Sequence, residues 1–585
     1  MFYRDRTLVL GQGQFADQVR DALANAAIDC KPLQRVQGQQ RRIRYAQRLI
    51  LADQHIERAA ILAAEVESLD KTAGHARRQT RLWLGAELLA PDDHPHRSWR
   101  YLCWPRTAAR ILFQRYPLHF CADAAEPQAP RLLVLGAGAL ARAVTVQAMR
   151  LGHYGNGRLR IDLLCADPEQ QQQLFQQAYP QARQFCDLSF HRIDGHSSLP
   201  SGPLAAAYVG LDDDQASIAA SKRLSDQLQH AGQAATPIFL LLHNAIEDAP
   251  LRSWDGRRYP FMALSEVCDP AVLFSDTRDT LARIIHDHYQ DSIASQTRDT
   301  AKLPASVAWA SLDESYRDAS RNQGDHVSAK LALINCRATP IDTGIDTDNH
   351  SQLFTFAPDD VERLAQIEHD RWAADRYLAG WTHAEQRDNA QKHHPDLIPF
   401  AALSEPLKDL DRFAVRLLPA LLGRQEQTVQ PNLRVLIWLA QFQAGNKTLH
   451  ALADQLMQRL LERFPGQQPT LLCRLANPAE RALVHRAIEH YGATLRVLFP
   501  PDSPPAADPD NDHQRQSWLA LLSRAEARHA LTHREPDPQW LRARADLLML
   551  DDAALSRLLD DRPVNHPRLV QTQAKGQPLR WHFDY

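Results

Sequence analysis

The sequence predicts a multidomain α/β protein with a mainly helical module between strand-rich parts. Apolar strands followed by glycine turns open the chain at "LVLG" (8–11) and recur at "LVLG" (133–136), which is 125 residues later. Strand and helix patterns alternate again from about residue 431, and a helical pattern between these parts occurs twice. A chain of 585 residues is long enough for several such domains.

The composition is that of a globular protein, with 44% hydrophobic and 23% charged residues. The net charge of -3 provides no general attraction to nucleic acid, so we expect no direct nucleic-acid binding. The eight cysteines are scattered without a CxxC pair, as expected of buried thiols in a reducing compartment. The apolar run "PIFLLLH" is too short for a bilayer span and the first residues lack a signal-peptide pattern, so we expect a cytoplasmic protein.

The first glycine turn follows the opening strand, with Gly11 and Gly13 in the pattern G-x-G-x-x-A. Such glycines allow a tight turn, and backbone N–H groups at the following helix can then approach a phosphate. The second strand of this unit (1–120) is followed by the basic stretch "KPLQRVQGQQRRIRY" instead of an acidic residue. We therefore expect this copy to bind a different nucleotide or none.

The second copy (130–262) is more complete, with Gly136, Gly138 and Ala141 in the turn. Asp167 ends the next strand, where a carboxylate can hold ribose hydroxyls, and Asp194 ends a plausible third strand. We expect NAD(H) or an adenine nucleotide here. The alternative is a turn that only maintains the fold. A positioned acid/base pair such as Tyr-x-x-x-Lys is missing, so hydride transfer is disfavoured.

Both copies resemble the NAD-binding Rossmann domain of Trk-type potassium-uptake regulators, the RCK or TrkA-N domain. "AYVGLDDDQASIAAS" is similar to that family's segment after the fourth strand. The resemblance implies nucleotide binding, and a soluble regulator of a potassium channel or transporter is one function it implies. A membrane protein would then be a partner.

An internal repeat lies in the helical part. "LARIIHDHY" (281–289) aligns with "LAQIEHDRW" (364–372) at a separation of 83 residues. "WASLDESYRDASRNQ" from position 309 aligns with "FAALSEPLKDLDRFA" from position 400 at a separation of 91. We infer two homologous units, 272–336 and 355–424, related by a pseudo-twofold axis.

The second unit resembles the RyR domain, the repeat named after ryanodine receptors and also found in bacterial proteins. The matching features are the His369 and Trp372 helix, Gly380-Trp381 at its end, the Arg387-Asp388 turn, the "HPDLIPF" loop and the closing "DRFAVRLLPALL" helix. The resemblance implies binding of nucleotides or nucleotide-derived messengers.

Residue types on the first helix of this unit suit such a ligand. Indoles stack on purines, guanidinium groups meet phosphate in a bidentate way, and carboxylate or imidazole groups bind ribose or amines. The candidate ligand-binding residues are Glu368, His369, Arg371, Trp372, Arg376 and Trp381, with His286 and Tyr289 at matching positions of the first unit. The alternative is structural: the tryptophans pack between helices, and the arginines pair with Glu368, Asp370 or Asp375.

The last part, 431–585, faintly resembles SLOG-type nucleotide sensors. Its loop "CRLANPAERALVHRA" has Asn477-Pro478 where that family has glycine, which indicates a degenerate copy used for dimerisation or as a scaffold. Only Glu480 and Arg481 carry over from the family pattern.

Together these resemblances favour a nucleotide- or messenger-binding sensor that forms a homo-oligomer, in bacterial antiviral or stress signalling. An alternative is an enzyme that processes NAD(P) or another nucleotide through Glu368 and His369, but an enzyme is less favoured. The chain has no P-loop lysine motif, nucleophile elbow or HExxH, and we expect no metal site.

Overall fold

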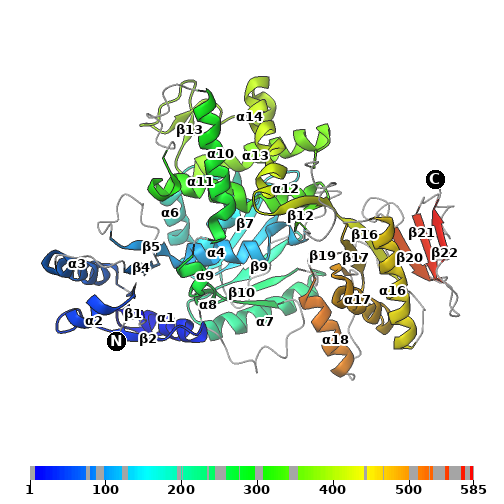
Figure 1. Cartoon of the computed structure of the whole chain (residues 1–585), viewed down its shortest axis with the longest axis horizontal. Helices are drawn as coiled ribbons and strands as arrows, with labels where there is room; N and C mark the ends of the chain where they lie inside the picture. The colour runs from blue at the N-terminus through cyan, green and yellow to red at the C-terminus, as the bar shows by residue number, and fades with distance from the viewer. Residues whose placement is uncertain are drawn as a thin grey trace.

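In the residues that it describes, the computed structural model contains three large sheets and a helical module (Figure 1). Two of these sheets are parallel, and the third is parallel except for its last strand pair. The predicted α/β fold class with parallel sheets is confirmed. The structure describes residues 7–53, 55–73, 79–86, 98–121, 129–193, 199, 202–233, 236–243, 258–275, 277–296, 307–341, 354–439, 445–464, 467–499, 512–525, 527–530, 547–551, 568–572 and 580–583. Asp194, one of the predicted nucleotide-site residues, lies outside them.

The first sheet is parallel, with the strand order β2-β1-β3-β4-β5. The strand order reverses between β1 and its neighbour β3. The first glycine turn lies beside this point, at the carboxyl end of β1. Open parallel sheets usually bind their ligands at such a position. The elements are β1 (Thr7–Leu10), α1 (Gln14–Asn25), β2 (Cys30–Leu33), α2 (Gln40–Tyr45), β3 (Arg48–Ala52), α3 (Ile56–Ala73), β4 (Thr80–Gly85) and β5 (Arg100–Cys103).

The second sheet is parallel, with the order β11-β10-β9-β6-β7-β8. This is the strand order of a doubly wound fold, and the second glycine turn lies beside the crossover between β6 and β9. The elements are β6 (Arg131–Leu135), α5 (Ala139–Leu151), β7 (Leu159–Cys165), α6 (Pro168–Ala178), β8 (Cys186–Arg192), β9 (Ala206–Val209), α7 (Asp214–His230), β10 (Ile238–Leu242) and β11 (Arg258–Met262).

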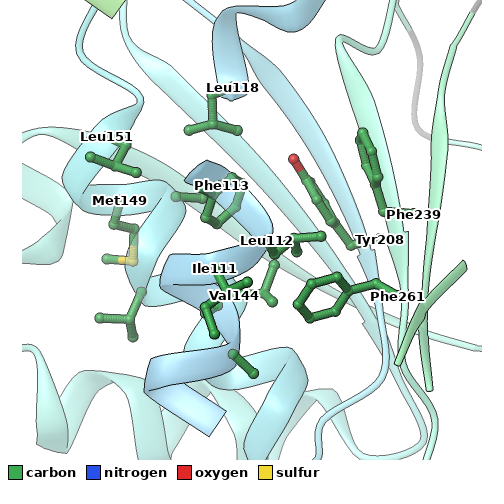
Figure 2. Packing of buried hydrophobic residues seen from close by; sticks show 14 of the residues in the cluster. Ile111, Leu112, Phe113, Leu118, Val144, Met149, Leu151, Tyr208, Phe239 and Phe261 are labelled. Carbon is green, nitrogen blue, oxygen red and sulfur yellow. The ribbon is translucent and has the colours of Figure 1, made fainter. Parts of the chain in front are cut away.

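Helix α4 (Trp104–Arg115) follows the first sheet in sequence but covers a face of the second. Figure 2 shows Phe113 of α4 close to Tyr208 of β9, and their rings lie 5.6 Å apart in an edge-to-face arrangement. The short helix α8 (Ala263–Val267), which follows the second sheet, packs in turn against α1 and α4. The two α/β units are therefore held together by apolar burial, which is the main stabilising force available to such an interface.

The helical module consists of two segments with the same order of elements. The first contains α10 (Thr280–Gln296), a 3-10 turn (Trp309–Ser311), α11 (Glu314–Asp325), α12 (Val327–Leu333) and β12 (Cys336–Pro340). The second contains α13 (Pro358–Leu378), a 3-10 turn (Phe400–Ala402), α14 (Glu405–Arg416), α15 (Leu418–Gly423) and β15 (Gln427–Pro431). The second segment also carries a small pair of strands, β13 (Thr382–His383) and β14 (His393–His394), in the loop after α13.

The strand pair β12–β15 is antiparallel and joins the two segments. Ala338 faces Val429, which is the residue that corresponds to it at the separation of 91 (338 to 429). Cys336, at the start of β12, faces Pro431 at the end of β15. Pro340, at the end of β12, faces Gln427 at the start of β15. This register is the one that a local twofold relation between the segments requires.

The C-terminal sheet has the order β19-β18-β17-β16-β20-β21-β22 and is parallel except for its last pair. The predicted strand-helix-strand-helix-strand start is present. The elements are β16 (Leu433–Trp438), α16 (Asn446–Arg463), β17 (Pro469–Cys473), α17 (Pro478–Tyr491), β18 (Thr494–Phe499), α18 (Asp512–Ser523), β19 (Ala527–Ala530), β20 (Leu547–Asp551), β21 (Arg568–Thr572) and β22 (Arg580–Phe583).

Candidate functional site

Helix α13 carries most of the predicted ligand-binding residues, and their surroundings differ sharply along it. Glu368 and Arg371 are buried, at 5% and 4% exposure. The Arg371 guanidinium donates to Glu368 at 2.8 Å and also to Asp375, while Lys330 of α12 pairs with Glu368 at 2.5 Å. The donors of Arg371 are therefore directed at protein carboxylates.

The charges of this cluster are mutually compensated. Burial alone raises the pKa of Glu368, but the adjacent Arg371 and Lys330 outweigh it and hold the pKa below its ordinary value. Glu368 is therefore an ionised carboxylate whose oxygens are occupied by two cations. These contacts match the alternative interpretation of the sequence, in which Glu368 and Arg371 form ion pairs within the protein instead of binding a ligand. Neither side chain is accessible to a ligand in this conformation.

His369 and His286 occupy equivalent places in the two segments. The Nε2 atom of His369 lies 2.8 Å from the carbonyl oxygen of Ile398, and that of His286 lies 2.9 Å from the carbonyl oxygen of Val307. The two acceptor residues, Ile398 and Val307, are 91 residues apart, which is the separation of the repeat in this part of the module. Both histidines therefore bind the equivalent carbonyl of their own segment. Each therefore ties a long helix to the loop before the 3-10 turn, which is a structural role.

The Nδ1 atom of His369 lies 3.3 Å from a carboxylate oxygen of Asp411 on α14. Burial lowers the pKa of His369, but the bonds to Asp411 and to the carbonyl of Ile398 outweigh burial and raise the pKa above its ordinary value. Burial also raises the pKa of Asp411. The imidazole is thus engaged at both nitrogens.

Further along α13, Trp372, Arg376, Trp381 and His394 form what we call the aromatic-arginine cluster. The His394 ring meets Trp372 at 5.0 Å and Trp381 at 6.0 Å, both edge-to-face. The guanidinium of Arg376 lies over the Trp381 ring at 5.7 Å. Both indoles and Arg376 are only partly buried. Unlike Glu368 and Arg371, these groups remain within reach of solvent.

Arg376 is held differently from Arg371. Its Nε atom is buried without a hydrogen-bond partner, and no ion pair involves Arg376 among the described residues. Burial lowers the pKa of Arg376, while neighbouring Asp375 opposes that effect. A buried donor without an acceptor costs free energy, about 1–3 kcal/mol for a typical group. An acceptor supplied by a ligand would remove this cost.

The first segment carries Tyr289 on α10 at the position that corresponds to Trp372, and its side chain is 46% exposed. Burial raises the pKa of the Tyr289 phenol on α10, and the charges of Arg387 and Arg376 act on it in the opposite direction. Tyr316 of α11 in turn acts on Arg376. The structure therefore brings together Trp372, Arg376 and Trp381 of the predicted set, and the His369 ring adjoins them at 5.5 Å from Trp372. Glu368 and Arg371 lie in the buried ion cluster instead.

The first glycine turn is occupied by a carboxylate of the chain itself. Asp53, which follows β3, has a fully buried side chain and accepts the backbone N–H of Gln12 at 3.2 Å. Arg58 donates to both Asp53 oxygens, at 2.7 and 2.8 Å. Because the carboxylate uses the backbone donor that the motif offers to phosphate, the turn at Gly11 and Gly13 binds its own aspartate.

The second turn has a related arrangement. Gly136 has a φ of 123°, a backbone conformation that favours glycine. At Gly138, a Cβ atom would lie 2.6 Å from the Oδ1 atom of Asp212 and would collide with that carboxylate. Ala141 is buried in α5, and Asp167 caps α6 by accepting the backbone N–H of Gln170 at 3.0 Å. Asp167 thus lies at the predicted end of β7, with one oxygen used for the helix.

A small cavity of about 240 Å³ lies between the two turns and connects the α/β units. It is lined by Phe15, Trp83 and Trp104 of the first unit and by Asp212 and His243 of the second. The Phe15 and Trp104 rings stack at 6.1 Å, and His243 meets Trp104 at 5.8 Å. The volume that the described residues enclose is smaller than the roughly 300–1,000 Å³ usual for ligand pockets.

The C-terminal domain also places a carboxylate at the carboxyl edge of its sheet. Glu480 accepts the backbone N–H groups of Leu439, at 3.0 Å, and Ala476, at 2.7 Å. Arg481 donates to the carbonyl of Leu475 at 3.0 Å, and Asn477 caps α17. Glu480 and Arg481, the two residues that match the SLOG-type pattern, therefore bind backbone groups of the chain itself. They do so at the carboxyl edge of the sheet, where a phosphate would approach.

Sequence reasoning did not identify Asp53, Lys330 or His394 as important. Asp53 directly follows an apolar strand, and that position was the available signal. Lys330 lies in the apolar pattern "SAKLALI", where a single cation signals a buried partner. His394 is the first residue of the "HPDLIPF" loop that resembles the RyR domain, and that resemblance was the available signal.

Residues 343–423 match the family model of the RyR domain. The prediction of an RyR domain in the second segment is thereby confirmed, and the aromatic-arginine cluster lies inside the matched range. The RCK- and SLOG-like resemblances stay predictions. Among the described residues, no group of three or more His, Cys, Asp or Glu side chains is arranged to hold a metal ion. None of the helices in these described parts is long and apolar enough to traverse a bilayer.

Proposed function

We propose that this protein is a sensor that binds a nucleotide or a nucleotide-derived messenger at the aromatic-arginine cluster. The ligand would place its base against the indoles of Trp372 and Trp381 and its phosphate against Arg376. The observation that carries this proposal is the Arg376 guanidinium, which lies over Trp381 at 5.7 Å with a buried Nε that lacks an acceptor.

The chemistry of the cluster supports an aromatic anion as the ligand. Indole faces bind planar bases, and base–aromatic stacking contributes about 1–3 kcal/mol per base in nucleic-acid complexes. A guanidinium group binds phosphate through parallel hydrogen bonds. Tyr289, which corresponds to Trp372 at the separation of 83, is exposed and offers a phenol of the first segment as a further hydrogen-bonding group.

The position of α13 supports a signalling role. Asp375, next to Arg376 in sequence, accepts from Asn322 of α11 at 3.0 Å and lies 3.8 Å from Arg150 of α5. His326 of the first segment also lies 3.2 Å from the carbonyl of Leu151 at the end of α5. A ligand that shifts α13 would therefore act on the second α/β unit, which is the basis of a population shift between two conformations.

The processing-enzyme alternative is weaker. It relied on Glu368 and His369 as acid and base, and both are engaged in protein contacts. Binding of NAD(H) or an adenine nucleotide at the second glycine turn, oligomer formation and a role in antiviral or stress signalling are kept as parts of the proposal that rest on resemblance alone. A soluble regulator of a potassium channel or transporter is kept as an alternative function, which also rests on resemblance.

Native mass spectrometry of the purified full chain tests the proposal, together with titration of ATP, NAD and cyclic nucleotides. Arg376→Gln should abolish retention and weaken binding at least tenfold, while the Tm of the ligand-free chain stays within about 2 °C. Arg416→Gln, an exposed arginine on α14, is the charge-matched control. A large fall in Tm for Arg376→Gln with unchanged ligand binding would show that the cluster only packs the domain. Product formation during incubation would favour the enzyme alternative.

A further inference from the structure

A cavity of about 990 Å³ lies between helix α13 and the second α/β unit. One wall is a face of α13, and the opposite wall consists of the loop between α5 and β7 together with Gln184 and Phe185, which precede β8. Among the described residues that line the cavity, none belongs to the aromatic-arginine cluster. The volume lies within the range of small-molecule sites, so this is a second place on α13 where a ligand can bind.

Helix α13 presents a regular stripe of side chains to this cavity. Arg363, Asp370 and Tyr377 line it and follow one another at intervals of seven residues. Seven residues are close to two helical turns, so these side chains lie on one face of the helix. Each interval also corresponds to about 10 Å along the helix axis. The stripe therefore offers a cation, an anion and an aromatic ring in that order along the cavity.

The carboxylate of Asp370 is not used by the protein. It has no hydrogen bond or ion pair with any of the described residues, whereas Glu368 and Asp375 of the same helix bind Arg371. Asp370 is open to the cavity, yet the walls displace enough water that burial raises its pKa. The charge of the adjacent His369 opposes this effect. A cation that enters the cavity would stabilise the ionised form of such a carboxylate.

Arg363 is the corresponding cation. Its charge acts on the pKa of Asp360, one turn earlier, but Arg363 forms no ion pair or hydrogen bond within the described part of the chain. Arg158, which also lines the cavity, pairs with Asp187 at 3.2 Å. Burial lowers the pKa of His153 to about 4, so that imidazole is neutral at pH 7. Arg363 and Asp370 thus remain as one cation and one anion without partners, which suits a ligand that carries both charges.

An aromatic wall continues the stripe beyond Asp370. The rings of Phe185 and Tyr377 are stacked, with centroids 6.0 Å apart and planes inclined by 11°. The Tyr377 hydroxyl donates to the carbonyl of Leu397 at 3.3 Å, and the His153 ring lies 5.6 Å from Phe185. These contacts hold the rings in place, and such a wall favours an aromatic group of a ligand.

We propose that this cavity binds a short peptide whose first residue is aromatic. The terminal ammonium of the peptide would meet Asp370, its aromatic side chain would lie against Phe185 and Tyr377, and its terminal carboxylate would meet Arg363. An extended tripeptide spans about 10 Å, which matches the rise of α13 between positions 363 and 370. The site does not depend on the proposed nucleotide site, although both ligands would contact the same helix.

The test is calorimetric titration of phenylalanyl-glycyl-glycine into the purified full chain. Asp370→Asn and Arg363→Gln each remove one charge with little change in shape. Each should weaken binding about tenfold or more, because each removes a hydrogen bond between charged groups. Asp359→Asn, which changes an exposed carboxylate in the first turn of the same helix, is the matched control and should leave the affinity unchanged. An unchanged Tm of each variant without peptide shows that the fold is intact.

Modified peptides test each contact without altering the protein. N-acetylation and C-terminal amidation should each weaken binding to the wild-type chain about tenfold. The N-acetylated peptide should lose nothing further in Asp370→Asn, because the ammonium and this carboxylate form one contact. Triglycine, which lacks the ring, and free phenylalanine, which is too short to reach Arg363, should also bind more weakly than the tripeptide.

Defined results would overturn the proposal. A wild-type chain that binds none of these peptides, or binding that is unaffected by both Asp370→Asn and Arg363→Gln, would overturn the site. Equal affinity for the free and the N-acetylated peptide would overturn the role of Asp370, and equal affinity for phenylalanine and the tripeptide would overturn that of Arg363. Arg376→Gln should leave peptide binding unchanged, whereas the nucleotide site fails only if ATP, NAD or cyclic-nucleotide binding ignores that variant.

Discussion

Lys330 of the first helical segment and Glu368 of the second form a buried ion pair with a nitrogen–oxygen separation of 2.5 Å. The residue of the second segment that corresponds to Lys330 is Leu421, which lies 91 residues later. The residue of the first segment that corresponds to Glu368 is Ile285, which lies 83 residues earlier. Both Leu421 and Ile285 are buried and apolar. They lie on α15 and α10, two helices that pack against each other. One interface of the module is thus ionic, and its counterpart is hydrocarbon.

We expect Lys330→Leu alone and Glu368→Ile alone each to lower the free energy of unfolding by about 3–5 kcal/mol, because each leaves an uncompensated buried charge. The double variant Lys330→Leu/Glu368→Ile copies the apolar pair of the other interface and should lose less than the sum of the two. Urea unfolding of all three variants measures this coupling. Strict additivity would contradict the pairing.

Gly136→Ala should destabilise the second α/β unit strongly, by on the order of 3 kcal/mol. The residue has a φ of 123°, and its Cβ would lie 2.0 Å from the carbonyl oxygen of Gly210. The matched control is Gly445→Ala, since no atom lies within 4 Å of that Cβ and its φ is -69°. Thermal unfolding followed by circular dichroism should separate the two, and equal Tm values would refute the tight approach of the turn to β9.

Asp53→Ala should lower the free energy of unfolding by about 1–3 kcal/mol. The change leaves Arg58 and the backbone N–H of Gln12 without their acceptor, and the partial exposure of Arg58 moderates the loss. Asp29→Ala provides the comparison, because its pair with Lys31 at 3.6 Å is exposed and should contribute less than about 0.5 kcal/mol. Denaturant titration at one pH measures both. Similar losses for the two would mean that the carboxylate in the first glycine turn is not important for stability.

The stability of the chain should fall as the pH drops below about 6.5, in part because of His153. Burial lowers the pKa of His153 to about 4 in the folded protein, although the bond to the carbonyl of Met149 opposes this. The unfolded chain therefore binds the proton between pH 6.5 and about 4, and protonation favours unfolding there. The loss attributable to His153 at pH 5 is on the order of 2 kcal/mol.

His153→Gln should remove that part of the pH dependence. The measurement is the difference in unfolding free energy between pH 7.5 and pH 5 for both chains. His230→Gln, an exposed histidine at the end of α7, is the control. If the wild type and His153→Gln have the same difference, the ring is not held neutral by its surroundings.

Local patterns in the sequence specified much of this protein. The glycine turns after apolar strands gave the carboxyl edges of two sheets, because only a parallel α/β unit uses that order of strand, turn and helix. The repeated His-Asp-aromatic pattern identified two segments with equivalent contacts, such as those of His286 and His369 with the carbonyls of Val307 and Ile398. The motifs of the second unit, predicted at 355–424, also indicated an RyR domain, and the family model of that domain matches residues 343–423.

Only the tertiary structure decided which polar residues remain within reach of a ligand. Glu368, Arg371 and Arg376 share one helix, yet Lys330, which is distant in sequence, converts Glu368 and Arg371 into a buried ion cluster and leaves Arg376 beside the indole of Trp381. Likewise, the glycine motif specifies a turn, while the carboxylate of Asp53, more than 40 residues away, occupies it. Partners of this kind depend on how helices and strands meet in space, and a linear pattern contains no information on that distance.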